Sequence, residues 1–223
     1  MPLSPPHRQV LVTRFRSYRF LVLLLALLLL LVGSPFVGDD VPDRVILTLF
    51  LTILLFAAVG AASTMRHERW IAASLATASG AVIGAGLLLE HRLIFLPALA
   101  LFTLYLAYTI SVVLRRLLTT NQIDADILCG AAAIYLLIGV AWALSYWIIY
   151  GLDRGAFTAN AALNLPPYTI HEFLYYSFSC LTTLGIGDIS PVNRFAQIWS
   201  MLETVTSNLY IALLVSRLVS LYR

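Results

Sequence analysis

The residues best suited to chemistry in this chain form a short polar stretch, TTLGIGD, at positions 182–188. Its glycines, Gly185 and Gly187, can adopt backbone with positive φ, which the β-branched Ile186 between them resists. Alternating such glycines with ordinary residues can aim successive carbonyl oxygens toward one axis, where they could replace the water around an ion. The stretch therefore predicts a line of backbone carbonyls that can bind cations.

The chain around this stretch has the composition of an integral membrane protein. Of its 223 residues, 61% are hydrophobic and 11% are charged, and the mean hydropathy is +0.90. A spanning helix needs roughly 20 mainly apolar residues, and five windows meet that need: 20–37, 45–64, 70–89, 93–114 and 127–150. A sixth candidate span, 195–222, carries Glu203 and Arg217. The composition excludes an ordinary soluble domain, and the net charge of +3 suggests no nucleic-acid partner.

A half-length helix is expected immediately before the polar stretch, at about residues 170–182. Thr169 and Glu172 have the spacing of a capping box, which marks its start. This segment is apolar and aromatic but too short to span, so it would dip inward from the outer face with the negative end of its dipole at the membrane centre. Backbone outside a helix is tolerated there only when it is buried in protein or lines a watery path. The arrangement predicts a pore.

The segment LYYSFSCLTTLGIGDISP resembles the pore helix and selectivity filter of tetrameric potassium channels, whose signature is TVGYG. The last span, LETVTSNLYIALLVSRLVSLY, is similar to the inner helix of bacterial two-span channel modules, so the resemblance covers about 127–223. It implies an all-α membrane protein and a homotetramer. Each chain would have a four-helix bundle followed by a two-helix pore module with a re-entrant pore helix. The first four spans resemble six-span channels only in number and order.

The resemblance also implies roles for individual residues. The ion-binding filter would comprise Thr183, Leu184, Gly185, Ile186 and Gly187. Potassium ions would bind at the first four of these, with the Thr183 hydroxyl at the innermost site. Asp188 would brace the filter against the pore helix, where Tyr175 offers a hydroxyl in place of the family's usual indole. The supporting residues would be Asp188, Tyr175, Tyr176, Ser179 and Glu203.

Three residues depart from the family pattern. Ile186 stands where Tyr or Phe is usual, so it lacks the side-chain hydrogen bond that braces the filter. Ser179 stands where some bacterial relatives have an acid, and Ser207 lies near a frequent hinge glycine. The first two departures leave a weakly selective monovalent cation channel as an alternative.

The last span carries the remaining candidate residues. Helical spacing places Thr204, Asn208, Ile211 and Val215 on one face. We expect that face, with Ser207, to line the cavity and gate, and packing between subunits is the alternative. An ionisable residue inside a span is a functional candidate. For Glu203 we expect a structural bond to a pore-helix hydroxyl such as that of Ser179 or Tyr176, with ion contact as the alternative.

Arginines indicate the topology, because cytoplasmic loops are enriched in basic residues. They predict both termini in the cytoplasm of a multi-pass protein of the cell (plasma or inner) membrane; a cleaved signal peptide at the start is the alternative. The expected division is a cytoplasmic segment 1–19, a four-helix domain 20–114, an inner linker 115–126 that suits a short surface helix, and a pore domain 127–223 with its filter at 183–188. The fourth span carries no charge until Arg115 and Arg116, so strong voltage gating is not expected, and this pair would contact anionic lipid.

Together these features predict a passive, homotetrameric potassium channel that is not an enzyme, needs no cofactor and has K⁺ as its permeant ion. No soluble ligand-binding domain is expected. The rival from another class is a secondary transporter with a discontinuous helix. Such carriers often have a second interrupted segment, for which TASGAVIGAG in the third span is the only candidate. A membrane enzyme is disfavoured because the sequence offers no cluster of nucleophile, base or metal ligands.

Overall fold

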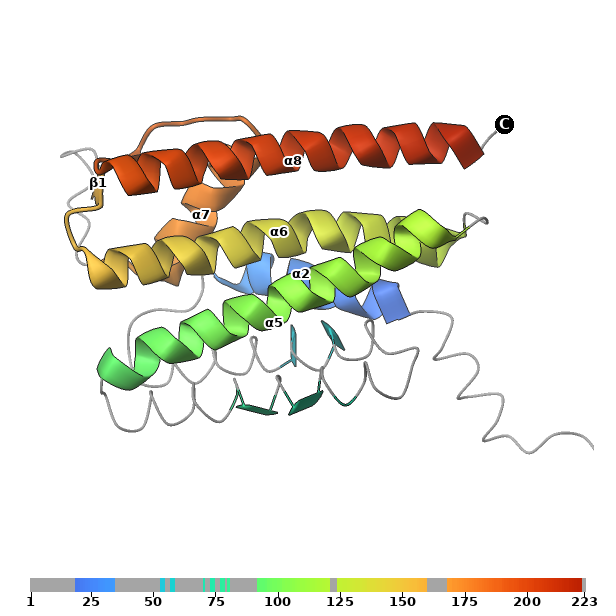
Figure 1. Cartoon of the computed structure of the whole chain (residues 1–223), viewed down its shortest axis with the longest axis horizontal. Coiled ribbons are helices and arrows are strands. Elements are labelled where there is room, and N and C mark those ends of the chain that lie inside the picture. Colours follow the sequence, from blue (N-terminus) through green and yellow to red (C-terminus); the bar gives the residue numbers. More distant parts are fainter. Residues whose placement is uncertain are drawn as a thin grey trace, which may run out of the picture.

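The computed structural model describes residues 19–34, 92–120, 124–159 and 168–221, with a few single positions between 53 and 80. Its elements in chain order are α2 (Arg19–Gly33), α5 (Arg92–Thr119), α6 (Ala125–Leu152), β1 (Phe157–Ala159), α7 (Ile170–Leu181), β2 (Ile189–Pro191) and α8 (Arg194–Leu221) (Figure 1). Among the described residues, three helices are long and apolar enough to cross a membrane, in α5, α6 and α8. The expected spans 45–64 and 70–89 lie almost entirely outside the described residues, so the count of six stays a prediction.

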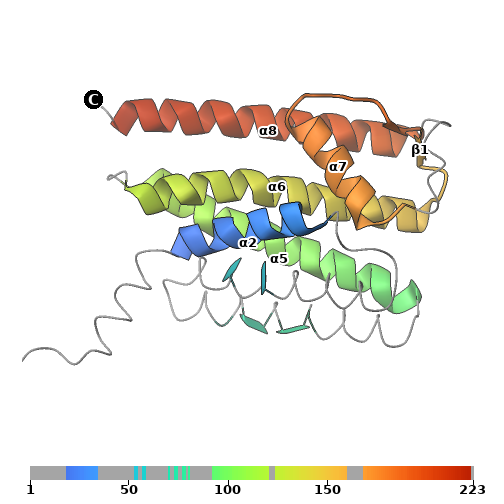
Figure 2. The ribbon, with the colours of Figure 1, turned by 180° about the vertical axis from the view of Figure 1, so that it is seen from behind.

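Helix α6 is the centre of the described fold. It packs against α2 and α5 on one side and against α7 and α8 on the other (Figures 1 and 2). At its start, Asp124 caps the helix by accepting from the amide of Ile127 at 2.8 Å. The neighbouring Asp126 accepts from the amides of Phe20 and Leu21 at 3.1 and 3.3 Å. These are amides at the start of α2 that lack partners within their own helix, so the two helices are held together at this end.

Helix α5 corrects the expected linker 115–126. We expected the fourth span to end at residue 114 and a separate surface helix to follow, but α5 continues unbroken to Thr119. The amide of Thr120 bonds to the carbonyl of Arg116 at 3.0 Å, and Leu117 in the last turn is buried. Because that leucine gains by packing, the helix extends beyond the arginine pair instead of ending at it.

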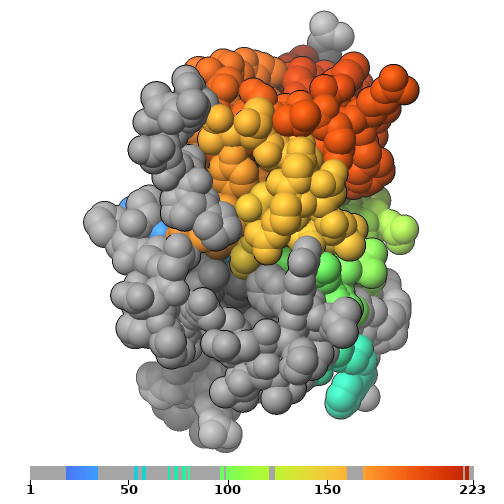
Figure 3. Space-filling view, turned by 90° about the vertical axis from the view of Figure 1, so that its left-hand side faces the viewer, coloured from blue at the N-terminus to red at the C-terminus, as the bar shows by residue number. Residues whose placement is uncertain are grey.

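The described fold is helical, as expected, and its helices α6 and α8 are joined by a short two-stranded antiparallel ribbon. Strand β1 pairs with β2 in the register Phe157 to Pro191, Thr158 to Ser190 and Ala159 to Ile189. The side chain of Asn193 donates to Asp153 at 2.8 Å and accepts from the amide of Ala196 at 2.7 Å, which caps α8. Figure 3 views the molecule from this end, where the chain after α6 (yellow) lies against the chain entering α8 (orange). The ribbon thus ties the end of α6 to the start of α8.

Helix α8 buries a narrow stripe toward α6 and α7. The stripe consists of residues at spacings of three and four, as a helical face requires: Ala196, Ser200, Glu203, Ser207 and Tyr210. Much of the opposite side of α8 is exposed in the single chain, including Met201 and Leu213. The stripe is mostly small or polar, so hydrogen bonds as well as apolar packing hold α8 in place.

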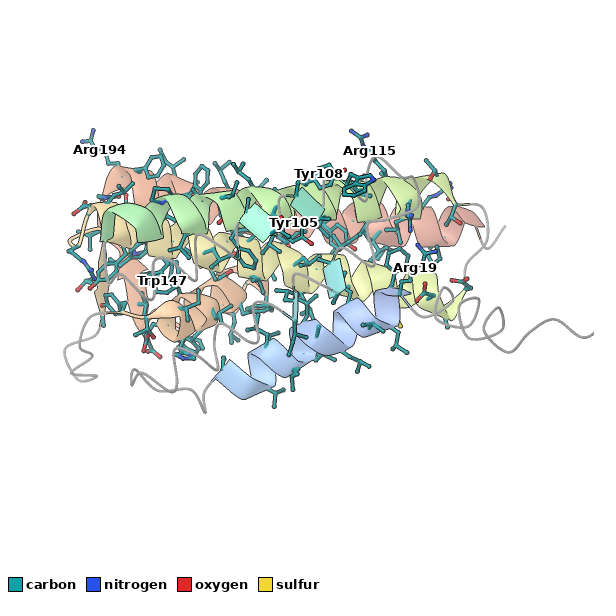
Figure 4. All side chains as sticks on the ribbon, turned by 90° about the horizontal axis from the view of Figure 1, so that it is seen from below. Arg19, Tyr105, Tyr108, Arg115, Trp147 and Arg194 are labelled. Atoms are coloured by element: carbon teal, nitrogen blue, oxygen red, sulfur yellow. The ribbon has the colours of Figure 1, made fainter. Side chains whose placement is uncertain are left out.

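Basic residues lie at both ends of the described helices, in the arrangement that the expected topology requires. Figure 4 shows Arg115 and Arg19 toward one end of the helices and Arg194 at the other. This is the division of basic residues on which the expected topology depends, with Arg115 and Arg19 on the inner side. Which end faces the cytoplasm stays a prediction.

Helix α7 begins with the capping box that the sequence predicts. Thr169 accepts from the backbone at the start of the helix, and its own amide donates to the Glu172 carboxylate at 2.7 Å. The helix then crosses between α6 and α8, and the chain after it returns alongside α8 (Figure 2). The capping box therefore fixes where this short helix starts.

Replacing Thr169 by Ala is expected to loosen the first turn of α7. Loss of an N-cap side chain costs about 1 kcal/mol, which corresponds to roughly a fivefold change in a local opening equilibrium. Hydrogen exchange measured by mass spectrometry should show that acceleration at the start of α7. Thr119→Ala, at the exposed end of α5, is the matched control and should leave exchange in α7 unchanged; equal exchange in both variants would contradict the capping role.

Candidate functional site

The backbone of the segment after α7 alternates in handedness. We call residues 183–188 the filter segment. Its φ angles are +60° at Thr183, +60° at Gly185 and +85° at Gly187, with no other positive φ among the described residues. The two glycines adopt this conformation at little steric cost. Thr183 is β-branched and pays for it, which is the kind of strain that proteins retain at functional sites.

The amides of the filter segment face α7. The amide of Gly185 donates to the carbonyl of Ser179 at 3.1 Å, and the amide of Ile186 donates to the Ser179 hydroxyl at 3.1 Å. Within the described part of the chain, no hydrogen bond is recorded to four filter carbonyls, and all four residues are exposed: Thr183, Leu184, Gly185 and Ile186. Ser179 therefore holds two amides of the filter segment toward α7, and the carbonyl oxygens of the segment remain free to accept other partners.

The carboxyl end of α7 is more fully paired than the sequence suggests. We expected unpaired carbonyls there, but each of the last four has a donor. The Phe178 carbonyl accepts from the amide and hydroxyl of Thr182, and that of Ser179 accepts from Gly185. The last two carbonyls accept across the fold, that of Cys180 from Thr204 of α8 and that of Leu181 from Tyr135 of α6, both at 3.3 Å. The helix end is thus locked to both long helices.

The outer end of the filter segment is tied to α7 by one side-chain bond. The Tyr175 hydroxyl donates to the Asp188 carboxylate at 2.9 Å, and this bond raises the pKa of the tyrosine, which keeps its proton as the donor. A cavity of about 110 Å³ lies between the two segments, lined by Tyr175, Tyr176, Ser179, Cys180, Gly185, Gly187, Asp188 and Ile189. The filter segment therefore contacts α7 at its amides and at Asp188, with a small open volume between these contacts.

Side chains from α6 and α8 hold the middle of α7. Tyr176 bonds to Ser200 of α8 at 2.7 Å, and the Ser177 hydroxyl lies 2.7 Å from the Gly139 carbonyl of α6. Glycine at 139 permits this close approach, because a Cβ there would lie 2.7 Å from a ring carbon of Phe178. The pore-helix candidate is thus wedged between two long helices with little freedom to shift.

Glu203 has different partners from those expected. We expected a bond to Ser179 or Tyr176, but its carboxyl group contacts the Ser177 hydroxyl of α7 and accepts from the Tyr146 hydroxyl of α6 at 2.6 Å. The kind of partner is as expected, and the residue differs. Ser179 faces the filter segment and Tyr176 faces Ser200, whereas Ser177 faces the fully buried Glu203.

Only some of the residues expected to line a cavity share an exposed face of α8. Three of them, Asn208, Ile211 and Val215, are exposed along one side of α8 in the single chain. Thr204 is half-buried against the Cys180 carbonyl. Ser207 is fully buried in the α8 stripe and donates to the Thr204 carbonyl at 2.9 Å, so it does not share that open face. In the single chain Ser207 therefore lies on a different face of α8, and the expected cavity lining stays a prediction.

Sequence reasoning missed the residues of α6 that position α7. Tyr135, Tyr146 and Gly139 all lie in a span whose apolar character conceals them. The sequence signal is the set of polar residues at 200, 203, 207 and 210 of α8, because polar groups repeated at helical spacing require polar partners on the facing helices. The apolar sequence of α6 carries no such signal.

The match to known proteins covers the region that holds this geometry. Residues 127–223 match a protein-family model described as "Ion channel". The match supports membership of this region in the potassium-channel superfamily. The channel domain therefore includes α7, the filter segment, α8 and nearly all of α6. Ion channels are a class of passive transport proteins and not of enzymes. No curated protein and no solved structure matches the chain.

Tyr175→Phe is expected to destabilise the outer end of the filter segment of the channel domain. The lost bond is exposed in the single chain, so we expect a cost of about 1 kcal/mol and roughly fivefold faster hydrogen exchange in residues 186–188. Tyr150→Phe is the control, because the recorded neighbours of its ring all lie outside the filter segment and phenylalanine keeps that ring. Unchanged exchange in Tyr175→Phe would show that the bond does not stabilise this segment.

Proposed function

We propose that four copies of this chain form a passive potassium channel that conducts through the backbone carbonyls of the filter segment. The observation that carries this proposal is the alternation of positive φ at Thr183, Gly185 and Gly187, together with the bonds of the Gly185 and Ile186 amides to Ser179. Backbone of this kind presents several carbonyl oxygens to one side. Rings of such oxygens, one from each subunit, can replace the hydration shell of K⁺.

The proposed ion path has its innermost site at Thr183. The Thr183 hydroxyl donates to the Thr182 carbonyl at 2.6 Å, which leaves the lone pairs of its oxygen available to an ion. The carbonyls of Thr183, Leu184, Gly185 and Ile186 would form the successive sites above it. A K⁺ ion would move from one site to the next as another enters behind it, with no chemical change in the protein.

Four copies are proposed because one chain supplies only a fraction of each ring. In the single chain, Leu184 and Ile186 are 67% and 47% exposed, and Leu209 of α8 is 58% exposed. Large apolar side chains beside exposed polar backbone are characteristic of a surface that another subunit covers. A closed ring with fourfold symmetry buries this surface equally in every copy.

A weakly selective monovalent cation channel is the second candidate, and Ile186 is the residue that favours it. Its side chain offers no hydrogen bond to hold the filter segment from behind. The bracing that remains consists of the Ile186 amide on Ser179 and Tyr175 on Asp188. A secondary transporter is disfavoured by the ion-channel match.

Voltage dependence is proposed to be weak. Moving one charge through the membrane contributes about 2.3 kcal/mol per 100 mV, and α5 has no charged residue between Arg92 and Arg115. We propose further that Arg115 and Arg116 lie at the cytoplasmic surface near anionic lipid. Both termini would then be cytoplasmic in a six-span protein of the cell membrane.

The decisive experiment is the reversal potential of the purified chain in planar bilayers under opposing potassium and sodium gradients. A reversal near the potassium equilibrium potential is expected. A reversal near zero would favour the weakly selective channel, and saturable flux without current would overturn the channel proposal. The same records should show little change of conductance over 100 mV.

Gly185→Ala is expected to abolish conduction while leaving the assembled protein intact. A Cβ at Gly185 meets no atom within 4 Å in the single chain, so the effect would come from the +60° φ, which costs an L-residue roughly 1–2 kcal/mol. Gly155→Ala is the control, because that glycine lies outside the filter segment and does not have positive φ. Normal current in Gly185→Ala would show that the ion path lies elsewhere.

A further inference from the structure

A single buried carboxyl group lies where α6, α7 and α8 meet. Glu203 of α8 is fully buried. Its Oε2 accepts from the Tyr146 hydroxyl of α6 at 2.6 Å, and its Oε1 makes a short contact with the Ser177 hydroxyl of α7. The same Ser177 oxygen lies 2.7 Å from the Gly139 carbonyl of α6. Four oxygen-bearing groups therefore form one chain across three helices.

The number of hydrogens in this chain depends on the state of Glu203. A serine hydroxyl has one hydrogen, whereas a carboxylate and a carbonyl have none to donate. If Glu203 were ionised, Ser177 could donate to Glu203 or to Gly139 but not to both, and one close oxygen pair would have no hydrogen between its atoms. If Oε1 carries a proton, Glu203 donates to Ser177, Ser177 donates to Gly139, and Tyr146 donates to Oε2. Each of the three contacts then has one hydrogen.

The surroundings of Glu203 favour the same state. Its recorded partners in the described part of the chain are hydroxyl groups, and no cation is among them. The titratable groups that face it are tyrosines of α6 and groups of α7, all neutral in their ordinary state: Tyr135, Tyr146, Tyr176 and Cys180. An unpaired buried charge is strongly unfavourable. Among the described residues, only the neutral hydroxyls of Ser177 and Tyr146 could stabilise a carboxylate there, and no positive charge is recorded beside it.

We infer that Glu203 is a proton-binding site, held as the neutral acid, whose proton completes the chain of hydrogen bonds that fixes α7 between α6 and α8. The inference goes beyond the choice of permeant ion and rests on the helices of the channel domain. Ser177 precedes Ser179 on α7, and Ser179 holds two contacts of the filter segment. Glu203 is therefore a positioning residue for the filter segment: removal of its proton would leave one of the Ser177 contacts without a hydrogen and release α7 on that side.

Infrared spectroscopy of protein labelled with ¹³C-glutamate tests the proton directly. The chain has four glutamates, Glu68, Glu90, Glu172 and Glu203. At neutral pH we expect an isotope-shifted band of a protonated carboxyl group, which Glu203→Gln removes. Glu172→Gln is the control and should keep the band, since that carboxylate accepts from the Thr169 amide at 2.7 Å. Absence of a shifted band in the wild-type protein overturns the inference, whether or not any variant folds.

Conduction tests the consequence for the filter segment. Glutamine at 203 can accept from Tyr146 and donate to Ser177, so Glu203→Gln should keep the wild-type reversal potential. Alkaline pH should reduce the wild-type current by more than half as the carboxyl band disappears, and should leave the Glu203→Gln current unchanged. Equal alkaline loss in both proteins, or wild-type current that persists after the band has gone, overturns the link to the filter. The infrared measurement needs no ion flow, so failure of the channel proposal would be seen separately.

Discussion

The constraint on which this structure depends is that a bilayer offers no water to backbone polar groups. Helix α7 ends inside the protein, where four carbonyls would otherwise lack partners. The fold supplies a donor to each of them. The first two carbonyls accept from the turn and the filter segment that follow the helix, and the last two accept from Thr204 of α8 and Tyr135 of α6. The next four carbonyls, from Thr183 to Ile186, differ, because no donor to them is recorded among the described residues. The amides of Thr183, Gly185 and Ile186 donate to α7 instead. The boundary between these two groups of carbonyls lies at Thr183, the one non-glycine residue among the described residues with positive φ.

The change from paired to unpaired carbonyls at Thr183 requires α7 to be held rigidly. Polar side chains of the otherwise apolar helices hold it. Dispersion and apolar burial fix the distance between α6 and α8 without fixing the rotation of a short helix between them. Directional bonds from Tyr176 to Ser200 and from Ser177 to Gly139 and Glu203 fix the rotation as well. The ribbon of β1 and β2 fixes the other end of the filter segment, because it starts directly after Asp188. Strain at Thr183 can persist because the chain on both sides of it is anchored.

Local features of this site could be predicted from the sequence, and features that depend on helix rotation could not. The capping box at Thr169 and Glu172 and the positive φ at Gly185 and Gly187 follow from residue types a few positions apart, and the structure has them. The partner of Glu203 depends on which face of α7 meets α8, and Ser177 and Ser179 differ there by two helical positions. The continuation of α5 past Arg116 depends on a pocket for Leu117, and the three-residue strands depend on pairing between distant segments. None of these leaves a mark in local composition.

The position of Ile186 shows how bracing is divided in the proposed filter. A tyrosine there could hold the filter segment by its own side chain, whereas isoleucine leaves that task to the backbone. Its amide is bonded to Ser179 at 3.1 Å, and the residue two positions later is bonded to Tyr175 at 2.9 Å. Both partners belong to α7, so the spacing of the carbonyls is set by that helix and by whatever holds it. On the proposed function, discrimination between ions then depends on the contacts between α7, α6 and α8 more than on the side chain between the two glycines. The rigidity of such a filter segment is therefore set by the rigidity of α7.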